Sequence, residues 1–170
     1  LYISHPYLLE YYLINYLVVL NNFLYSSESI NNLKELKYGV DLLVKAKRYL
    51  RTENEKTRYF FYQDNVVHYY NMTGDFNSAV KYCEENMIPQ WEFYKDKVNA
   101  LLQGEFVTYI ATSYFGKKDY HSALKWLNKI YQEIKIENYP DVVLFCYMFY
   151  IIVHLELKNY DLIPSLLQSA

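Results

Sequence analysis

Apolar residues recur at steps of three and four along the first part of the chain. Between residues 8 and 24 they form one wide helical face, made of Leu8, Tyr12, Leu13, Tyr16, Leu17, Leu20, Phe23 and Leu24. A second periodic segment follows as far as Thr52, and Ser29 is expected to cap it. Because only four Gly and four Pro interrupt 170 residues, the pattern predicts an all-α protein. About eight helices are expected.

Thr52 marks the start of a third predicted helix. Glu55 stands three residues later, so the hydroxyl and the carboxylate can each bind a backbone amide at the helix start. This arrangement is a capping box, and the helix is expected to run to about Met72.

Two later stretches are nearly the same, "YYNMTGDFNSAVKY" at residues 69–82 and "SYFGKKDYHSALKW" at 113–126. In the first, Gly74 can take the left-handed conformation that ends a helix, and Asp75 can cap the next helix. In the second, Lys118 and Asp119 stand at these positions. Each stretch therefore predicts a helix, a tight turn and an antiparallel helix.

A weaker third copy is "VHLELKNYDLIPSLL", residues 153–167. Asn159 is expected to cap its second helix. His154 takes the position that Tyr70 and Tyr114 occupy in the other two copies. Pro164 cannot donate a backbone hydrogen bond, so this helix either starts late or is kinked.

These residues resemble the tetratricopeptide repeat family. The second copy carries the pattern at Val107, Ile110, Ala111, Tyr114, Tyr120, Ala123 and Leu127. The first carries it at Gln63, Val66, Val67, Tyr70, Gly74, Phe76, Ala79 and Cys83. The signature Trp is absent from both, and the helix-ending Pro is missing or displaced to Pro89. The copies are 44 and 40 residues apart, against about 34 in the family, which indicates longer hairpins.

The resemblance implies helix hairpins stacked as a superhelix in one domain, residues 1–170. Residues 1–52 form a helix pair without a clear motif, 53–93 and 94–137 are two tetratricopeptide-like units, and 138–170 is a weak, incomplete unit. The chain starts at Leu1 without an initiator Met, so we expect a fragment of a larger bacterial, cytoplasmic protein.

By the family's geometry, the first helix of each unit lines a groove that binds a protein or peptide. The groove positions are Phe61, Asp64, Asn65, His68, Asn71, Glu105, Thr108, Tyr109, Thr112 and Phe115. Asp64 and Glu105 would repel a terminal carboxylate, which favours a neutral or basic segment. The expected function is a protein-interaction scaffold. The alternatives are a peptide- or ligand-sensing regulatory domain that controls a missing output domain, and an all-α enzyme.

Candidate chemistry elsewhere in the chain is sparse. The four His are scattered, and no phosphate loop or nucleophile motif is present, so we expect no catalysis, cofactor or metal. Cys83 and Cys146 fall among apolar helical positions and are expected to be buried thiols. The net charge of −2 argues against nucleic acid. The basic cluster at Lys45–Arg58 is expected to be a solvated helix junction, and Trp91 and Tyr94 are expected to pack or to contact a partner.

Two apolar stretches, residues 8–25 and 142–153, are interrupted or too short for a membrane span. Residues 142–157 are apolar almost all round, with Phe145, Met148, Phe149, Ile152 and Leu155 on the groove side. We therefore expect another part of the parent protein to cover this helix.

Overall fold

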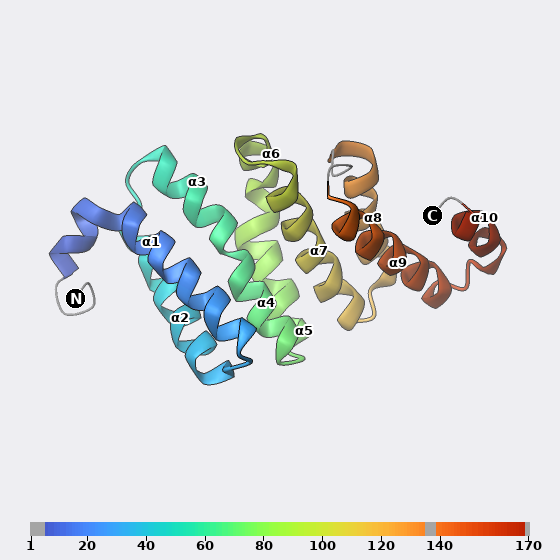
Figure 1. Ribbon diagram of the computed structural model, residues 1–170, viewed down its shortest axis with the longest axis horizontal. Helices are drawn as coiled ribbons and strands as arrows, with labels where there is room; N and C mark the ends of the chain where they lie inside the picture. The colour runs from blue at the N-terminus through green and yellow to red at the C-terminus, as the bar shows by residue number, and fades with distance from the viewer. Residues whose placement is uncertain (1–5, 135–138, 169–170) are drawn as a thin grey trace. The chain divides into compact units, whose positions relative to one another are not determined.

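Every regular element in the described residues, 6–134 and 139–168, is helical in the computed structural model (Figure 1). The predicted all-α class is therefore confirmed. The chain divides into two compact units, an N-terminal unit of residues 1–69 and a C-terminal unit of residues 70–170. The division falls inside one helix, α4 (Asp64–Met72).

The N-terminal unit is built on α1 (Pro6–Ser29), α2 (Leu33–Ala46) and α3 (Glu53–Tyr62). α1 packs against both of the other helices. Most of the apolar face predicted for α1 is the core face, because Leu13, Leu17 and Leu24 are at most 1% exposed. Tyr12 was wrongly placed on this face, since it is 50% exposed. Gly39 lets α2 approach closely, since a Cβ there would lie 2.6 Å from a methyl carbon of Leu24.

The helix boundaries of this unit differ from the prediction at two places. Ser29 does not cap α2: it is the last residue of α1, and its hydroxyl donates to the Tyr25 carbonyl. Asn32 is the cap instead, accepting a hydrogen bond of 3.2 Å from the Glu35 amide. α2 ends at Ala46 and a 3₁₀ turn follows (Lys47–Tyr49), so the helix stops short of Thr52.

The capping box at the start of α3 is confirmed. Thr52 Oγ1 accepts from the Glu55 amide at 3.2 Å, and Glu55 Oε2 accepts from the Thr52 amide at 2.8 Å. The single helix predicted from Thr52 to Met72 is instead broken at Gln63 into α3 and α4. Asp64 explains the break, because its carboxylate binds the next backbone amide, that of Asn65, at 2.6 Å and competes with helical hydrogen bonding.

The C-terminal unit continues from α4 through short and long helices. Its elements are α5 (Phe76–Tyr82), a π-helical turn (Cys83–Met87), α6 (Trp91–Tyr94), α7 (Ala100–Gly116), α8 (Tyr120–Glu133), α9 (Pro140–Glu156) and α10 (Ile163–Gln168). α7 packs against α5, α8 and α9. The fully buried Phe106, Val107 and Ile110 of α7 are the centre of this core.

Trp91 belongs to this core and not to a partner contact. Its indole is 1% exposed, stacks on Phe106 with ring centroids 5.1 Å apart, and meets Trp126 edge-on at 6.1 Å. Tyr94 is also buried. The short helix α6, at the boundary between the two predicted units, therefore packs on α7 through Trp91.

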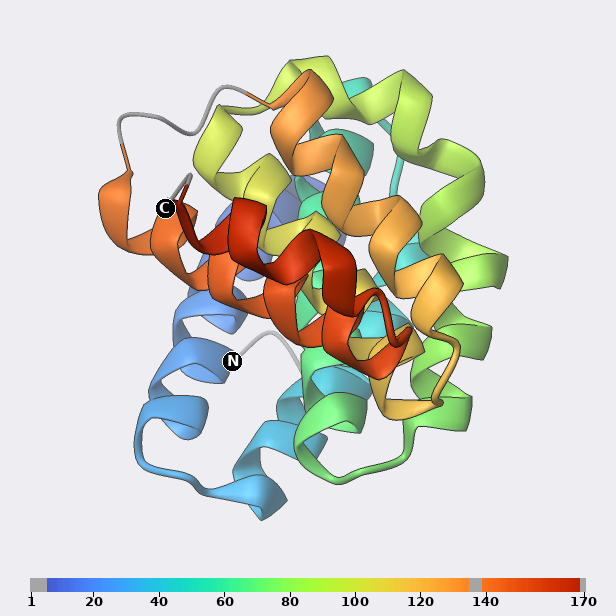
Figure 2. The same ribbon diagram turned by 90° about the vertical axis from the view of Figure 1, so that its right-hand side faces the viewer.

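The last helix of the chain lies beside α9 (Figure 2). The Tyr147 hydroxyl of α9 donates to the Leu166 carbonyl of α10. A 3₁₀ turn (Tyr160–Leu162) precedes α10, which begins at Ile163. The helix therefore starts late, and Pro164 stands in its first turn, where the missing N–H costs nothing.

Candidate interaction surface

Among the described residues, four helices end in the same way, at what we call helix joints. One residue in each joint is left-handed, with φ of 53° at Asn31, 74° at Gly74, 65° at Lys118 and 60° at Lys158. The next amide donates to the carbonyl five residues earlier, in the pairs Asn32 to Ser27, Asp75 to Tyr70, Asp119 to Tyr114 and Asn159 to His154, at 2.8 to 3.0 Å. This is the Schellman arrangement.

Two joints match the sequence prediction. Gly74 is left-handed as expected, Lys118 takes the same conformation although it carries a Cβ, and the carboxylates of Asp75 and Asp119 each accept from an amide three residues later at 3.1 Å. In the joint at His154 the prediction of a cap is wrong. The Asn159 side chain makes no cap hydrogen bond, and its Nδ2 lies 3.0 Å from His154 Nδ1.

The fourth joint, at Ser27–Asn32, was missed from the sequence. Its signal is the pair Asn31–Asn32, because Asn tolerates the left-handed conformation and is also a good helix cap. With this joint included, equivalent positions fall at Ser27, Tyr70, Tyr114 and His154, spaced 43, 44 and 40 residues apart. The helix pair of residues 1–52 therefore carries the same joint as the later hairpins.

The residue that follows each of the first three positions, Ser27, Tyr70 and Tyr114, contacts another helix, and the chemistry of the contact differs each time. In the N-terminal unit Glu28 Oε1 lies 2.8 Å from His68 Nε2. In the C-terminal unit Asn71 Nδ2 donates to the Tyr109 carbonyl at 3.0 Å. The Phe115 ring packs on Phe149 at 5.4 Å. The two partners match in chemistry each time: acid with imidazole, amide with carbonyl, ring with ring.

The fourth residue of this series is Leu155, and it breaks the pattern. Leu155 is 42% exposed. Four further apolar side chains of α9 are exposed to a similar fraction of their surface: Leu144 at 56%, Phe145 at 55%, Met148 at 56% and Ile152 at 43%. At about 100° per residue, these five side chains fall within an arc of about 100°. We call them the α9 stripe.

The corresponding positions of α7, 40 residues earlier, have a different character. They are Gly104, Glu105, Thr108, Thr112 and Phe115, and each is half-buried or buried. α9 accounts for part of this burial, since Cys146 Sγ lies 3.7 Å from Thr108 Oγ1 and Phe149 packs on Phe115. The same helix face is therefore covered on α7 and open on α9.

The predicted groove residues are placed differently in the two units. In the N-terminal unit Phe61 is only 5% exposed and packs edge-on against Phe60, so its assignment to an open groove is wrong. Asp64, Asn65 and His68 are half-buried; Asn65 Nδ2 donates to Asn21 Oδ1 at 3.1 Å, and His68 meets Glu28.

In the C-terminal unit the remaining six predicted residues are all half-buried: Asn71, Glu105, Thr108, Tyr109, Thr112 and Phe115. Thr108 and Thr112 turn their hydroxyls back to carbonyls of their own helix, at 2.7 and 2.9 Å. Most of these side chains therefore support helix packing. That the other nine residues form one binding groove stays a prediction.

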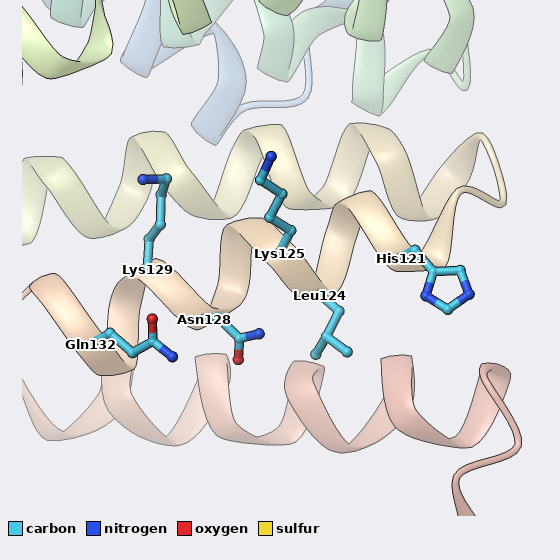
Figure 3. Close-up of a pocket in the computed structure, with 6 residues that line it drawn as sticks. All are labelled: His121, Leu124, Lys125, Asn128, Lys129 and Gln132. Atoms are coloured by element: carbon cyan, nitrogen blue, oxygen red, sulfur yellow. The ribbon is translucent and has the colours of Figure 1, made fainter.

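A shallow hollow of about 380 Å³ lies along α8 (Figure 3). Its lining comes from one helix: His121, Leu124, Lys125, Asn128, Lys129 and Gln132. Leu124 and Asn128 point toward α9, whereas Lys125 and Lys129 point to the opposite side. Lys129 already lies 3.6 Å from Glu92. Because the polar groups do not converge on one point, this hollow is a weaker candidate than the α9 stripe.

Both cysteines, Tyr114 and His154 are buried within packing contacts. Burial raises the pKa of the Cys83 thiol to about 12, while a hydrogen bond with Ser113 acts in the opposite direction. Burial and the nearby Glu84 carboxylate raise the pKa of the Tyr114 phenol, which donates to Glu84 at 3.1 Å. Burial lowers the pKa of His154. Within residues 6–134 and 139–168, no three His, Cys, Asp or Glu side chains gather as a metal site would require.

Comparison of the chain with protein-family models, curated proteins and solved structures found no match. Across the described helices, none combines the length and apolar character that crossing a bilayer requires.

Proposed function

We propose that this chain is a protein-binding scaffold of helix hairpins, with no catalytic role, and that it docks a partner on the α9 stripe. The observation that carries the proposal is the stripe itself: five neighbouring apolar side chains, each between 42% and 56% exposed. Apolar patches of this kind on a protein surface typically mark an interaction site.

A partner that binds the α9 stripe removes apolar surface from water. Each Å² of apolar surface contributes about 25 cal/mol when it is buried. Leu144, Met148 and Leu155 lie on one side of α9 and can be buried by a single helix, because residues at steps of three and four share one face. A partner with an apolar helix therefore gains most from this surface.

The resemblance to the tetratricopeptide repeat family supports the same class of function, since helical repeats of that family bind proteins on helix faces. The four helix joints support it further. The same joint recurs at four places in the described residues, as expected of a scaffold of stacked hairpins.

Affinity capture from the cells of origin tests the proposal. The bait is the intact chain in three forms: unchanged, Ile152→Lys and Val44→Lys. Val44 is a matched control, because it is a β-branched residue on α2 with the same exposure as Ile152, 43%. We expect proteins captured by the unchanged chain and by the Val44 variant to be lost from the Ile152 variant. Capture that is the same for all three baits would contradict the proposal.

A further inference from the structure

The segment that joins α2 to α3 concentrates positive charge. Residues 45–58 contain six basic and two acidic side chains, a net charge of +4, whereas the other 156 residues contain 11 basic and 17 acidic ones, a net charge of −6. A chain of overall charge −2 therefore carries a surface of the opposite sign. We call this surface the basic junction. Its exposed cations are Lys45, Lys47, Arg48 and Arg51.

Both carboxylates of the segment are already engaged elsewhere. Glu53 Oε1 lies 2.8 Å from the Lys56 ammonium. Glu55 is only 9% exposed, and its Oε2 accepts from the backbone amides of Arg51 and Thr52, each at 2.8 Å. The segment therefore offers no exposed carboxylate, apart from the one that pairs with Lys56, to compete with an acidic group from outside.

The Arg48 guanidinium is positioned by its neighbour in the chain. Its Cζ lies 4.7 Å from the centroid of the Tyr49 ring, and one of its amino groups donates to the Tyr49 hydroxyl at 2.7 Å. In the part of the chain that the structure describes, neither Arg48 nor Lys45 forms an ion pair with a carboxylate. Because a guanidinium has five N–H donors, Arg48 retains donors for a carboxylate that approaches from outside.

We propose that the basic junction docks an acidic segment of a protein partner, whose carboxylates pair with Arg48, Lys45 and the neighbouring cations. A guanidinium can bind a carboxylate through two parallel hydrogen bonds, and the lysines add attraction that steers the encounter. The junction belongs to the N-terminal unit, whereas the α9 stripe belongs to the C-terminal unit. The inference therefore goes beyond the proposed function and does not depend on it.

The charge of the rest of the chain argues against a nucleic acid or an anionic membrane as the occupant. Each of these polyanions extends well beyond the junction, and charges attract or repel over a range of about 8–10 Å at physiological salt. Phosphates outside the junction would therefore approach a chain whose other residues carry a net charge of −6. A short acidic segment can stay within the junction, so it gains the attraction without this repulsion.

Fluorescence anisotropy with the intact chain and a fluorescein-labelled oligoglutamate peptide of about eight residues tests the proposal, beginning at about 50 mM salt. We expect binding that weakens as salt rises to about 200 mM, because the paired groups are exposed and salt screens them. Arg48→Glu should weaken binding at least about tenfold, since it turns an attraction into a repulsion. Lys45→Glu is the second variant and should act in the same direction. Circular dichroism confirms that each variant is folded.

Lys34→Glu is the matched control. Lys34 is also exposed on α2, but it stands 11 residues before Lys45, about 16 Å along the helix. The substitution changes the net charge of the chain by the same amount as the two test variants. Peptide binding by the Lys34 variant should therefore stay within about twofold of the unchanged chain.

Three results would overturn the inference. The first is no peptide binding at low salt, and the second is equal weakening by Arg48→Glu and Lys34→Glu. The third is tighter binding, lost in the Arg48 variant, of oligothymidylate about 30 nucleotides long or of phosphatidylserine vesicles, which would make the occupant a polyanion. The side chains of the α9 stripe carry no charge, so the peptide assay does not report on them. This inference and the proposed function can therefore fail separately.

Discussion

The Ser113 hydroxyl donates a hydrogen bond of 2.9 Å to Asn71 Oδ1, which ties the end of α4 to the last turn of α7. Asn71 also donates to the Tyr109 carbonyl at 3.0 Å. Ser113 has no exposed surface, so water cannot easily replace Asn71 as its partner. The Asn71 side chain therefore joins α4 to α7 through polar contacts. At the equivalent position of the next joint, Phe115 joins α7 to α9 through a ring contact with Phe149.

Replacing Asn71 by Ala should destabilise the fold by about 1–3 kcal/mol, because it removes both hydrogen bonds and leaves buried polar groups without this partner. Urea unfolding followed by circular dichroism measures the change in the free energy of unfolding. Asn77→Ala is the matched control on α5, where the side chain is exposed, and should change the value by less than about 0.5 kcal/mol. Equal losses for the two variants would contradict this account of Asn71.

The left-handed residues of the joints predict opposite effects of two substitutions. Gly74→Ala should cost about 1 kcal/mol, through backbone strain alone, because a Cβ at Gly74 would meet no atom within 4 Å. Lys118→Gly should stabilise the protein by about 0.5 kcal/mol, since relief of strain at φ of 65° exceeds the extra entropy of Gly in the unfolded chain. Thermal or urea unfolding decides both; stabilisation by Gly74→Ala would show that the turn is not strained.

The sequence predicts the joints better than the helices between them. Gly74, Asp75 and Asp119 could be assigned because turn and cap residues act through local hydrogen bonds. The break at Gln63 could not, because "FFYQDNVV" has a continuous helical pattern and the break depends on one carboxylate, that of Asp64, turning back to the backbone. Asn159 was misassigned for a similar reason: its amide meets a side chain of the preceding helix, His154.

The binding surface was predictable only in part. The apolar character of residues 142–157 is evident in the sequence, and five of them stand open as the α9 stripe. Phe61 was misplaced because family geometry assigns positions by number alone, whereas the packing of α3 in this chain buries that ring against Phe60.

The cap of α8 should make stability depend on pH. A hydrogen bond with Ser122, helped by the nearby His121 and Lys117, lowers the pKa of Asp119 below its ordinary value. A carboxyl with a lowered pKa in the folded state stabilises the fold above its unfolded pKa of about 3.9, and this contribution is lost as pH falls through the folded value. The stability difference between the unchanged chain and Asp119→Asn should therefore be larger at neutral pH than near pH 3.

Asn32 provides the matched control for this pH dependence, because it caps α2 with a neutral amide. Asn32→Ala should cost about 1 kcal/mol at both pH values. Urea unfolding at the two pH values measures each difference. A difference for Asp119→Asn that grows as pH falls would mean that the carboxylate does not stabilise the joint.

Both thiols should be unreactive in the folded chain. Cys83 and Cys146 have no exposed surface, and burial raises the pKa of each, to about 12 for Cys83. Because the thiolate is the reactive form, modification by a disulfide reagent at pH 8 should be at least about 100-fold slower than in the unfolded chain. Absorbance of the released thiol follows the rate. Rapid modification of either cysteine in the native chain would reveal an opening that the packed structure does not have.

The central claim is that the α9 stripe is the surface that binds, and the three methionines report on it directly. Met148 lies in the stripe and is 56% exposed, Met72 is 37% exposed on α4, and Met87 is fully buried. In a chain labelled with ¹³C at the methionine methyl groups, each residue gives one NMR signal. When the chain is mixed with a captured partner, we expect the Met148 signal to move while those of Met72 and Met87 stay in place. A Met148 signal that does not change on mixing would contradict the claim.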